Sequence, residues 1–168
     1  IAAKALADLA TSLYDYNFIQ TASVLMLERS WFERGVQFDE SLTYGEDLDL
    51  WLQVLAQGGQ FVCTQRATCH YRKHSSSAMA QTIRMLERMG DFYKKHLGNP
   101  INPDKLRKQR LFDSRFFLGR MTWRTSPANA FAALRSCMGI EPFKPQPYFW
   151  GLMALAARAT SLFRKQRA

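Results

Sequence analysis

The segment from Glu46 to Ala56 constrains the fold of this chain more than any other. Its apolar residues form two strips when it is read as a helix: Leu48, Trp51, Leu52 and Leu55 at the spacing i, i+3, i+4, i+7, and Leu50 with Val54 beside them. A helix that is apolar around most of its circumference must be covered on more than one side. We therefore expect a largely buried helix, which ends at Gly58 and Gly59.

The segments around this helix indicate an α/β fold. Their residue types predict a buried strand over 19–27 and two shorter strands over 60–63 and 67–72. Residues 2–13 favour a helix, and residues 28–33 favour one helical turn that Gly35 stops. An order of strand, short helix, loop, buried helix and two strands is typical of a layered α/β domain.

The character of the chain changes after Ser75. Helices are expected over 78–97, 103–120, 126–138 and 148–164. Ser126 as N-cap and Pro127 at the first helical position open the third of these helices. We therefore expect an α/β region over residues 1–77 and a basic, all-helical extension over 78–168.

Charge is divided unevenly between the two parts of the chain. Residues 1–60 carry three basic and nine acidic side chains, a net charge of −6, whereas residues 61–168 carry twenty basic and five acidic ones, a net charge of +15. A basic half of this strength must be solvated or must face phosphates or anionic lipid.

The cysteines and the apolar runs bear on location. Three Cys residues are too few for a disulfide framework and favour a reducing compartment. No apolar run reaches the roughly 18 residues of a membrane-spanning helix, and no basic segment precedes an apolar one as in a signal peptide. We expect a cytoplasmic location, with the inner face of the cell membrane as the more specific alternative. Because the chain starts at Ile1, we also expect it to be a segment of a longer protein.

Several short motifs follow one another in a fixed order between about residues 15 and 80. They are Ser23–Arg29, Gly35 with Phe38-Asp39-Glu40, Glu46-Asp47, Asp49-Leu50-Trp51-Leu52, Gly58-Gly59 and Tyr71-Arg72-Lys73-His74 with Ser77. This ordered set resembles the second half of the catalytic domain of glycosyltransferase family 2, of the GT-A type. The resemblance implies a partial GT-A-like α/β domain that lacks its N-terminal, nucleotide-binding half.

The resemblance also implies roles for individual residues. Asp47, with Glu46 beside it, would be the catalytic base that takes the proton from the acceptor hydroxyl. The alternative is that both carboxylates only complement the helix dipole. Gly35, Asp39 and Arg72 would bind substrate. His74 would help to hold Mg²⁺ or Mn²⁺, and His70 is the competing candidate for that ligand.

Two features depart from the family pattern. Gln53 stands where the family usually has Arg. No Asp-x-Asp metal motif precedes the matched region, and Asp47-Leu48-Asp49 does not replace it, because residues i and i+2 point about 200° apart on a helix. The cation would therefore be held mainly by the missing half, and this segment alone is expected to be inactive.

The function expected from the resemblance is transfer of a sugar, with inversion, from a nucleotide-sugar donor to a hydroxyl acceptor. A glycan or lipid-linked acceptor in cell-surface polysaccharide synthesis fits this family. The rival interpretation is a non-catalytic, basic helical module that binds nucleic acid or an anionic membrane. The absence of a nucleic-acid-binding motif disfavours nucleic acid as a partner.

Two further patterns occur in the sequence. Cys63, Cys69, His70 and His74 together suggest zinc, but one short hairpin would have to supply all four ligands, so the cysteines are better explained as small core residues. Residues 148–168 combine an apolar run with a cationic end, which is typical of an interfacial helix that makes peripheral membrane contact. The alternative is a helix docked on its own domain.

Overall fold

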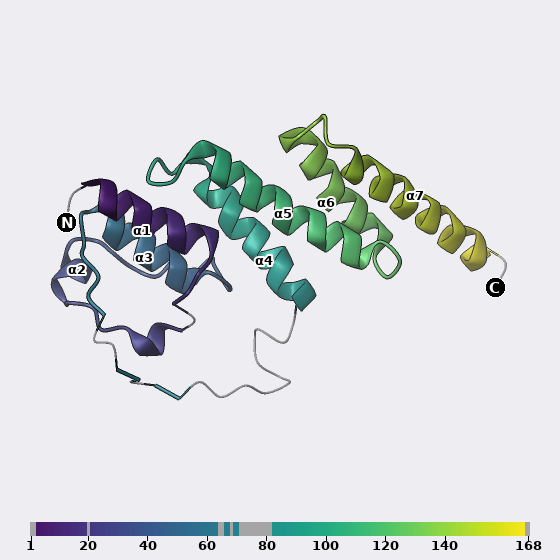
Figure 1. Cartoon of the computed structure of the whole chain (residues 1–168). Coiled ribbons are helices and arrows are strands. Elements are labelled where there is room, and N and C mark those ends of the chain that lie inside the picture. The colour runs from purple at the N-terminus through teal and green to yellow at the C-terminus, as the bar shows by residue number, and fades with distance from the viewer. Residues whose placement is uncertain (1–2, 20, 64–65, 68, 71–81, 167–168) are drawn as a thin grey trace.

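The computed structural model describes residues 3–19, 21–63, 66–67, 69–70 and 82–166 (Figure 1). Its regular elements are α1 (Ala3–Asp15), η1 (Ala22–Val24), α2 (Ser30–Glu33), α3 (Glu46–Ala56), α4 (Thr82–Lys95), η3 (His96–Gly98), α5 (Asp104–Thr122), α6 (Pro127–Ile140) and α7 (Pro145–Gln166).

The α/β fold class, and with it the partial GT-A-like sheet, is wrong for the described part of the chain, where every regular element is a helix and no strand forms. The expected strand over 19–27 instead contains a 3-10 turn, whose N-cap Thr21 accepts a hydrogen bond from the backbone N–H of Ser23. Thr21 and Leu25 have extended backbone angles, but an extended segment becomes a strand only when a neighbour pairs with it. β-forming residue types alone do not supply that neighbour.

The buried helix is confirmed, because α3 has the expected bounds of Glu46 to Ala56. Six of its apolar side chains are at most 3 % exposed: Leu48, Leu50, Trp51, Leu52, Val54 and Leu55. Left-handed glycines stand at both ends, Gly45 at φ 78° and Gly58 at φ 82°. The chain therefore enters and leaves the helix through turns that other residue types adopt only with strain.

The core forms where α1 and α4 cover α3. Leu13 of α1, Leu52 of α3 and Phe92 of α4 are completely buried in one apolar cluster. Tyr14 of α1 packs its ring 5.9 Å from that of Phe92, centroid to centroid. Segments that are far apart in sequence therefore lie side by side, and α4, from the expected helical extension, completes the core that covers α3.

The C-terminal helices pack in sequence, α4 on α5, α5 on α6 and α6 on α7, so that α7 lies at the end of the molecule far from α3 (Figure 1). The expected helices over 103–120 and 126–138 correspond to α5 and α6. Ser126 precedes α6 with Pro127 at its start, although the Ser126 side chain makes no capping hydrogen bond. None of the helices in the described ranges is long and apolar enough to cross a bilayer.

A substitution at Gly119 of α5 tests how closely α5 and α6 pack. A Cβ at this position would lie 2.5 Å from Cγ of Leu134, which is itself completely buried. We expect Gly119→Ala to lower the free energy of unfolding by about 1–3 kcal/mol, because overpacking outweighs the better helix propensity of Ala. Urea denaturation followed by circular dichroism measures this change.

Gly139→Ala is the matched control, because Gly139 is an exposed glycine of α6 whose Cβ would meet nothing within 4 Å. There the same substitution should raise the free energy of unfolding by up to about 1 kcal/mol. Equal effects of the two substitutions would show that α5 and α6 do not approach closely at Gly119.

Candidate active site at the start of helix α3

Three carboxylates occupy the first turn of α3: Glu46, Asp47 and Asp49. A helix N-terminus favours negative charge, because its free N–H groups point toward this end. The side chains differ in their surroundings, since Glu46 and Asp47 are half-buried whereas Asp49 is 1 % exposed. The helix start therefore presents carboxylates in two different environments.

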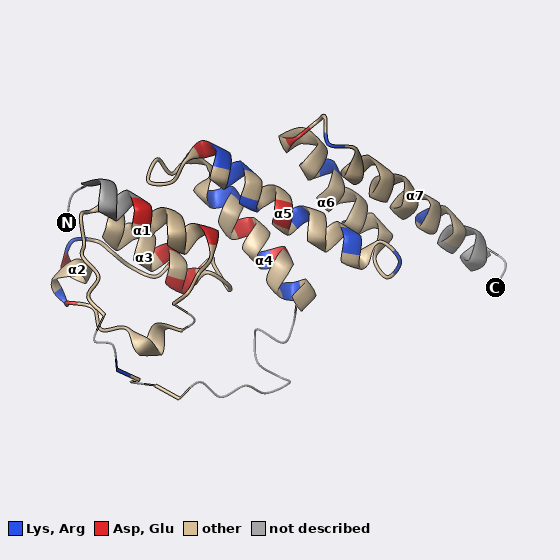
Figure 2. Cartoon of the chain, in the orientation of Figure 1, with Lys and Arg blue, Asp and Glu red and all other residues tan. Residues whose placement is uncertain are grey.

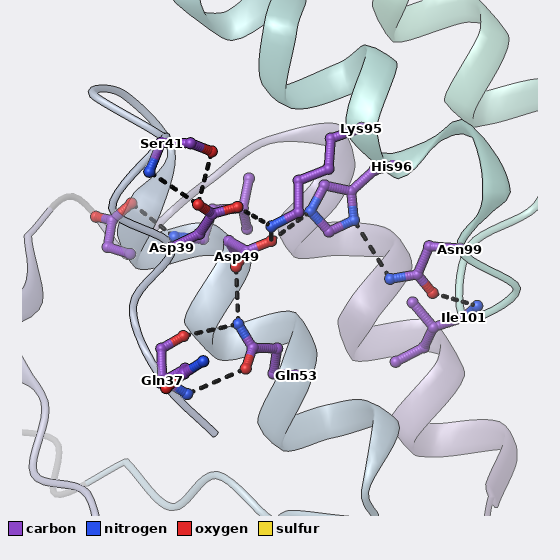
Figure 3. A network of polar contacts seen from close by, with 11 residues as sticks. Gln37, Asp39, Ser41, Asp49, Gln53, Lys95, His96, Asn99 and Ile101 are labelled. Atoms are coloured by element: carbon purple, nitrogen blue, oxygen red, sulfur yellow. Dashed lines mark hydrogen bonds and ion pairs between the residues drawn. The ribbon is translucent and has the colours of Figure 1, made fainter. Parts of the chain in front are cut away.

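Asp49 is the centre of a polar network that joins α3 to the end of α4 (Figure 3). Its Oδ1 accepts hydrogen bonds from Nζ of Lys95 at 2.8 Å and from Nε2 of His96 at 2.7 Å. Its Oδ2 accepts one from Nε2 of Gln53 at 2.7 Å. Burial alone would raise the pKa of Asp49, but the hydrogen bonds from His96, Lys95 and Gln53 outweigh it and lower the pKa.

Lys95 bridges two carboxylates. Its Nζ also donates to Oδ2 of Asp39 at 2.6 Å, while Oδ1 of Asp39 accepts from the backbone N–H and the hydroxyl of Ser41 at 2.8 and 2.6 Å. The hydrogen bond from Lys95 is the main reason that the pKa of Asp39 lies far below its usual value. The loop that contains Asp39 is thus fastened to α4 by the same cation that neutralises Asp49.

His96 is satisfied on both ring nitrogens (Figure 3). Since Asp49 can only accept, Nε2 must carry the proton, and Nδ1 is then the acceptor for the amide of Asn99 at 3.3 Å. The other end of that amide, Oδ1 of Asn99, accepts from the backbone N–H of Ile101 at 3.1 Å. A neutral imidazole with its hydrogen on Nε2 fits every contact.

Gln53, the departure from the family pattern, has a definite role here. Its Nε2 donates to the Gln37 carbonyl at 2.9 Å as well as to Asp49, and its Oε1 accepts from the Gln37 N–H at 3.2 Å. An arginine could donate but could not accept from that N–H. The amide therefore fastens the loop before α3 in a way that the residue usual in the family could not reproduce.

Asp47 differs from Asp49. Its Oδ1 accepts from the backbone N–H of Leu48 at 2.7 Å. Burial is the largest influence on its pKa and raises it, the negative charge of Glu46 raises it further, and the hydrogen bond from Leu48 opposes both. Asp47 thus holds its proton more tightly than an ordinary aspartate does, whereas Asp49 holds its proton less tightly.

The remaining expected site residues are not brought into this network. Gly35 is exposed in a left-handed turn after α2, at φ 87°. Arg72 and His74 lie outside the described residues, and the competing ligand His70 is exposed. In the described ranges no three His, Cys, Asp or Glu side chains are grouped as a metal site requires. Cys63 and Cys69 are exposed, so the expectation that they are small core residues is wrong.

Lys95 and His96 were missed by the sequence reasoning. They stand 46 and 47 residues after Asp49, so no local spacing links them to it. One signal was available: the register that buries Leu48, Leu52 and Leu55 also brings Asp49 close to the interior. A buried carboxylate requires a cation or several donors, and Lys95-His96 follows the apolar residues of α4.

Comparison with protein-family models, with curated proteins and with solved structures finds no match.

Asp49→Ala should lower the free energy of unfolding by about 3 kcal/mol, because it leaves the buried His96 without its acceptor and removes one of two carboxylates from Lys95. Since folding lowers the pKa of Asp49, its stabilisation is present above the unfolded value of about 3.9 and is lost as the pH falls through the folded value. Urea denaturation at several pH values measures both effects.

Glu33→Ala provides the control, because Glu33 forms an exposed ion pair with Arg29 and exposed pairs contribute little to stability. A loss of stability from Asp49→Ala no larger than that from Glu33→Ala would contradict the structural role of the network. So would an unchanged acid slope in the Asp49 variant.

Proposed function

We propose that this chain takes part in glycosyl transfer, and that Asp47 is the general base that removes the proton from the acceptor hydroxyl. Glycosyl transfer is proposed from the ordered motifs between about residues 15 and 80, and the observation that carries the role of Asp47 is its position, half-buried in the first turn of the buried helix α3 beside the Asp49 network. The opposite directions of the pKa shifts of Asp47 and Asp49 agree with this role. Neighbouring carboxylates whose pKa values are shifted in opposite directions commonly divide chemical and structural roles. Asp49 is fully engaged as an ion-pair partner, whereas Asp47 remains available for proton transfer.

The raised pKa of Asp47 is what the chemistry needs. A general base works best when its pKa approaches the working pH, because it must be ionised and still bind a proton in the transition state. The hydrogen bond from Leu48 engages Oδ1, so Oδ2 is the oxygen that can receive the proton. Glu46 acts through its charge, which raises the pKa of Asp47.

The position of Asp47 on a buried helix also suits the role of a general base. A base must be held close to its productive position, since small displacements cost large factors in rate. The buried apolar residues of α3 fix the helix in the core, and the Asp49 network fixes both its approach loop and the end of α4. Asp47 therefore stands on a helix turn that is held by both the core and the Asp49 network.

The proposed reaction is the one that the resemblance implies. The acceptor oxygen loses its proton to Asp47 and forms a bond to the anomeric carbon of the donor sugar. The bond from that carbon to the phosphate oxygen breaks, and the nucleoside diphosphate leaves with the electron pair. Among the described residues no three His, Cys, Asp or Glu side chains are grouped as a metal site. We propose, as the resemblance implies, that the expected Mg²⁺ or Mn²⁺ is held mainly by the nucleotide-binding half.

The charge pattern gives less support to the rival nucleic-acid module. Basic residues of α4 and α5 pair with acidic ones: Lys95 with Asp39 and Asp49, Arg115 with Asp91, and Lys108 with Asp104. Figure 2 shows red segments between the blue ones along these helices. Nucleic-acid binding favours a continuous, unpaired basic face.

Asp47→Asn should reduce turnover by about 10²–10⁴-fold, because it removes general-base assistance. The test measures nucleoside diphosphate released from UDP-, GDP- and dTDP-sugars, with glycan and lipid-linked acceptors, by the full-length protein that carries this chain. Since burial raises the pKa of Asp47, the rate should fall on the acid side at a pH above the ordinary aspartate value of about 3.9. Asp47→Asn should lack this acid limb.

Asp104→Asn is the matched control, because it makes the same change in the first turn of α5 at an exposed carboxylate. It should leave both the rate and the acid limb unchanged. If the folded Asp47→Asn variant transferred sugar at the normal rate, Asp47 would not be the base and would only complement the helix dipole. Absence of nucleoside diphosphate release by the wild-type protein with every donor would overturn the proposal itself.

A further inference from the structure

Helix α7 exposes an apolar face. Four large side chains are between 41 % and 68 % exposed: Tyr148, Phe149, Leu152 and Leu155. With the exposed Ala156 and Ala159 they cover one continuous side of the helix. We call these six residues the α7 outer face. Phe143, just before the helix, is 97 % exposed as well.

The opposite side of α7 is already docked. Pro147, Gly151 and Ala154 are buried, and a Cβ at Gly151 would lie 3.0 Å from the terminal methyl of Met138 on α6. These residues pack α7 on the rest of the molecule. A surface helix normally turns polar residues outward, but α7 is apolar on both sides between residues 147 and 157. The outer face therefore lacks the polar residues that a solvated helix usually turns toward water.

The C-terminal region that contains the outer face is strongly basic in sequence. From residue 114 to the C-terminus the sequence has nine Lys and Arg residues and a single acidic residue, Glu141. Arg120 of α5 lies with its guanidinium 5.8 Å from the ring centroid of Trp150 on α7, and Arg158 is exposed on α7 itself. Figure 2 shows no red segment on α7 among its described residues.

We propose that the α7 outer face is a docking surface for an anionic lipid bilayer. Exposed aromatic and leucine side chains with nearby cations are the pattern of a helix that lies in the membrane interface. A bilayer supplies both complements, an apolar interior for the outer face and negative charge for the cations. Self-association through this face would instead bring together two copies of the same basic region.

The inference does not depend on glycosyl transfer. It concerns α7, which lies far along the helical array from α3 (Figure 1), and its test needs no donor or acceptor. If both proposals hold, the bilayer would place the protein next to a lipid-linked acceptor. A result that overturns one proposal would not affect the other.

The test is co-sedimentation of the full chain with vesicles. Wild type should bind vesicles of phosphatidylcholine and phosphatidylglycerol at low salt, and binding should weaken without phosphatidylglycerol and at high salt. The double variant Leu152→Gln with Leu155→Gln should weaken partitioning at least about tenfold, because it removes two apolar side chains from the interface. Met26→Gln is the matched control, since Met26 is 97 % exposed in the N-terminal part, and it should bind as wild type does.

A second measurement separates insertion from charge attraction alone. Phe149→Trp adds a reporter to the outer face, and its fluorescence, taken as the difference from wild type, should shift to the blue and be quenched by brominated lipid. Equal binding of wild type and the double glutamine variant would overturn the proposal, as would a reporter that stays in water. Concentration-dependent dimers in sedimentation velocity that the same double variant abolishes would also overturn it, in favour of a second copy.

Discussion

The burial of the Asp49 carboxylate is the constraint on which the rest of the structure depends. A charge at 1 % exposure would be prohibitively costly without partners. Its partners are Lys95, the last residue of α4, and His96, the first residue of η3, so the end of α4 must stand next to α3 for the carboxylate to be ionised. The loop around Asp39 follows, because the same lysine holds it. One ionised group thus fixes the relative positions of a helix start, a loop and a second helix.

The same network distinguishes Asp47 from its neighbour. Lys95 and His96 satisfy Asp49 but do not reach around the helix, where residues i and i+2 point in different directions. Asp47 consequently keeps the half-buried position in which its pKa is raised. The two environments arise from one geometric fact, since the direction that the helix gives to each carboxylate decides which one is paired with Lys95 and His96 and which one is not.

Local patterns predicted the helices well and the strands poorly. The bounds of α3 followed from apolar spacing, because a helix closes its hydrogen bonds within its own segment. The segment over 19–27 had strand-forming residues, but a strand depends on partners elsewhere, and here Thr21 caps a turn instead. Asp47 was chosen from the resemblance, and its catalytic role stays a prediction. Lys95 and His96 could not be predicted, because a contact across 46 residues leaves no local periodicity.

The serial packing of α4 to α7 has a consequence for how the molecule opens. Each of these helices rests chiefly on its neighbours in sequence, as in a stack whose end unit has support on one side only. Local opening would then cost less free energy at α7 than at α5 and α6, each of which has a helix packed on both sides. Amide hydrogens of α7 should therefore exchange before those of α5 and α6, and α7 can detach and dock again while those two helices stay packed.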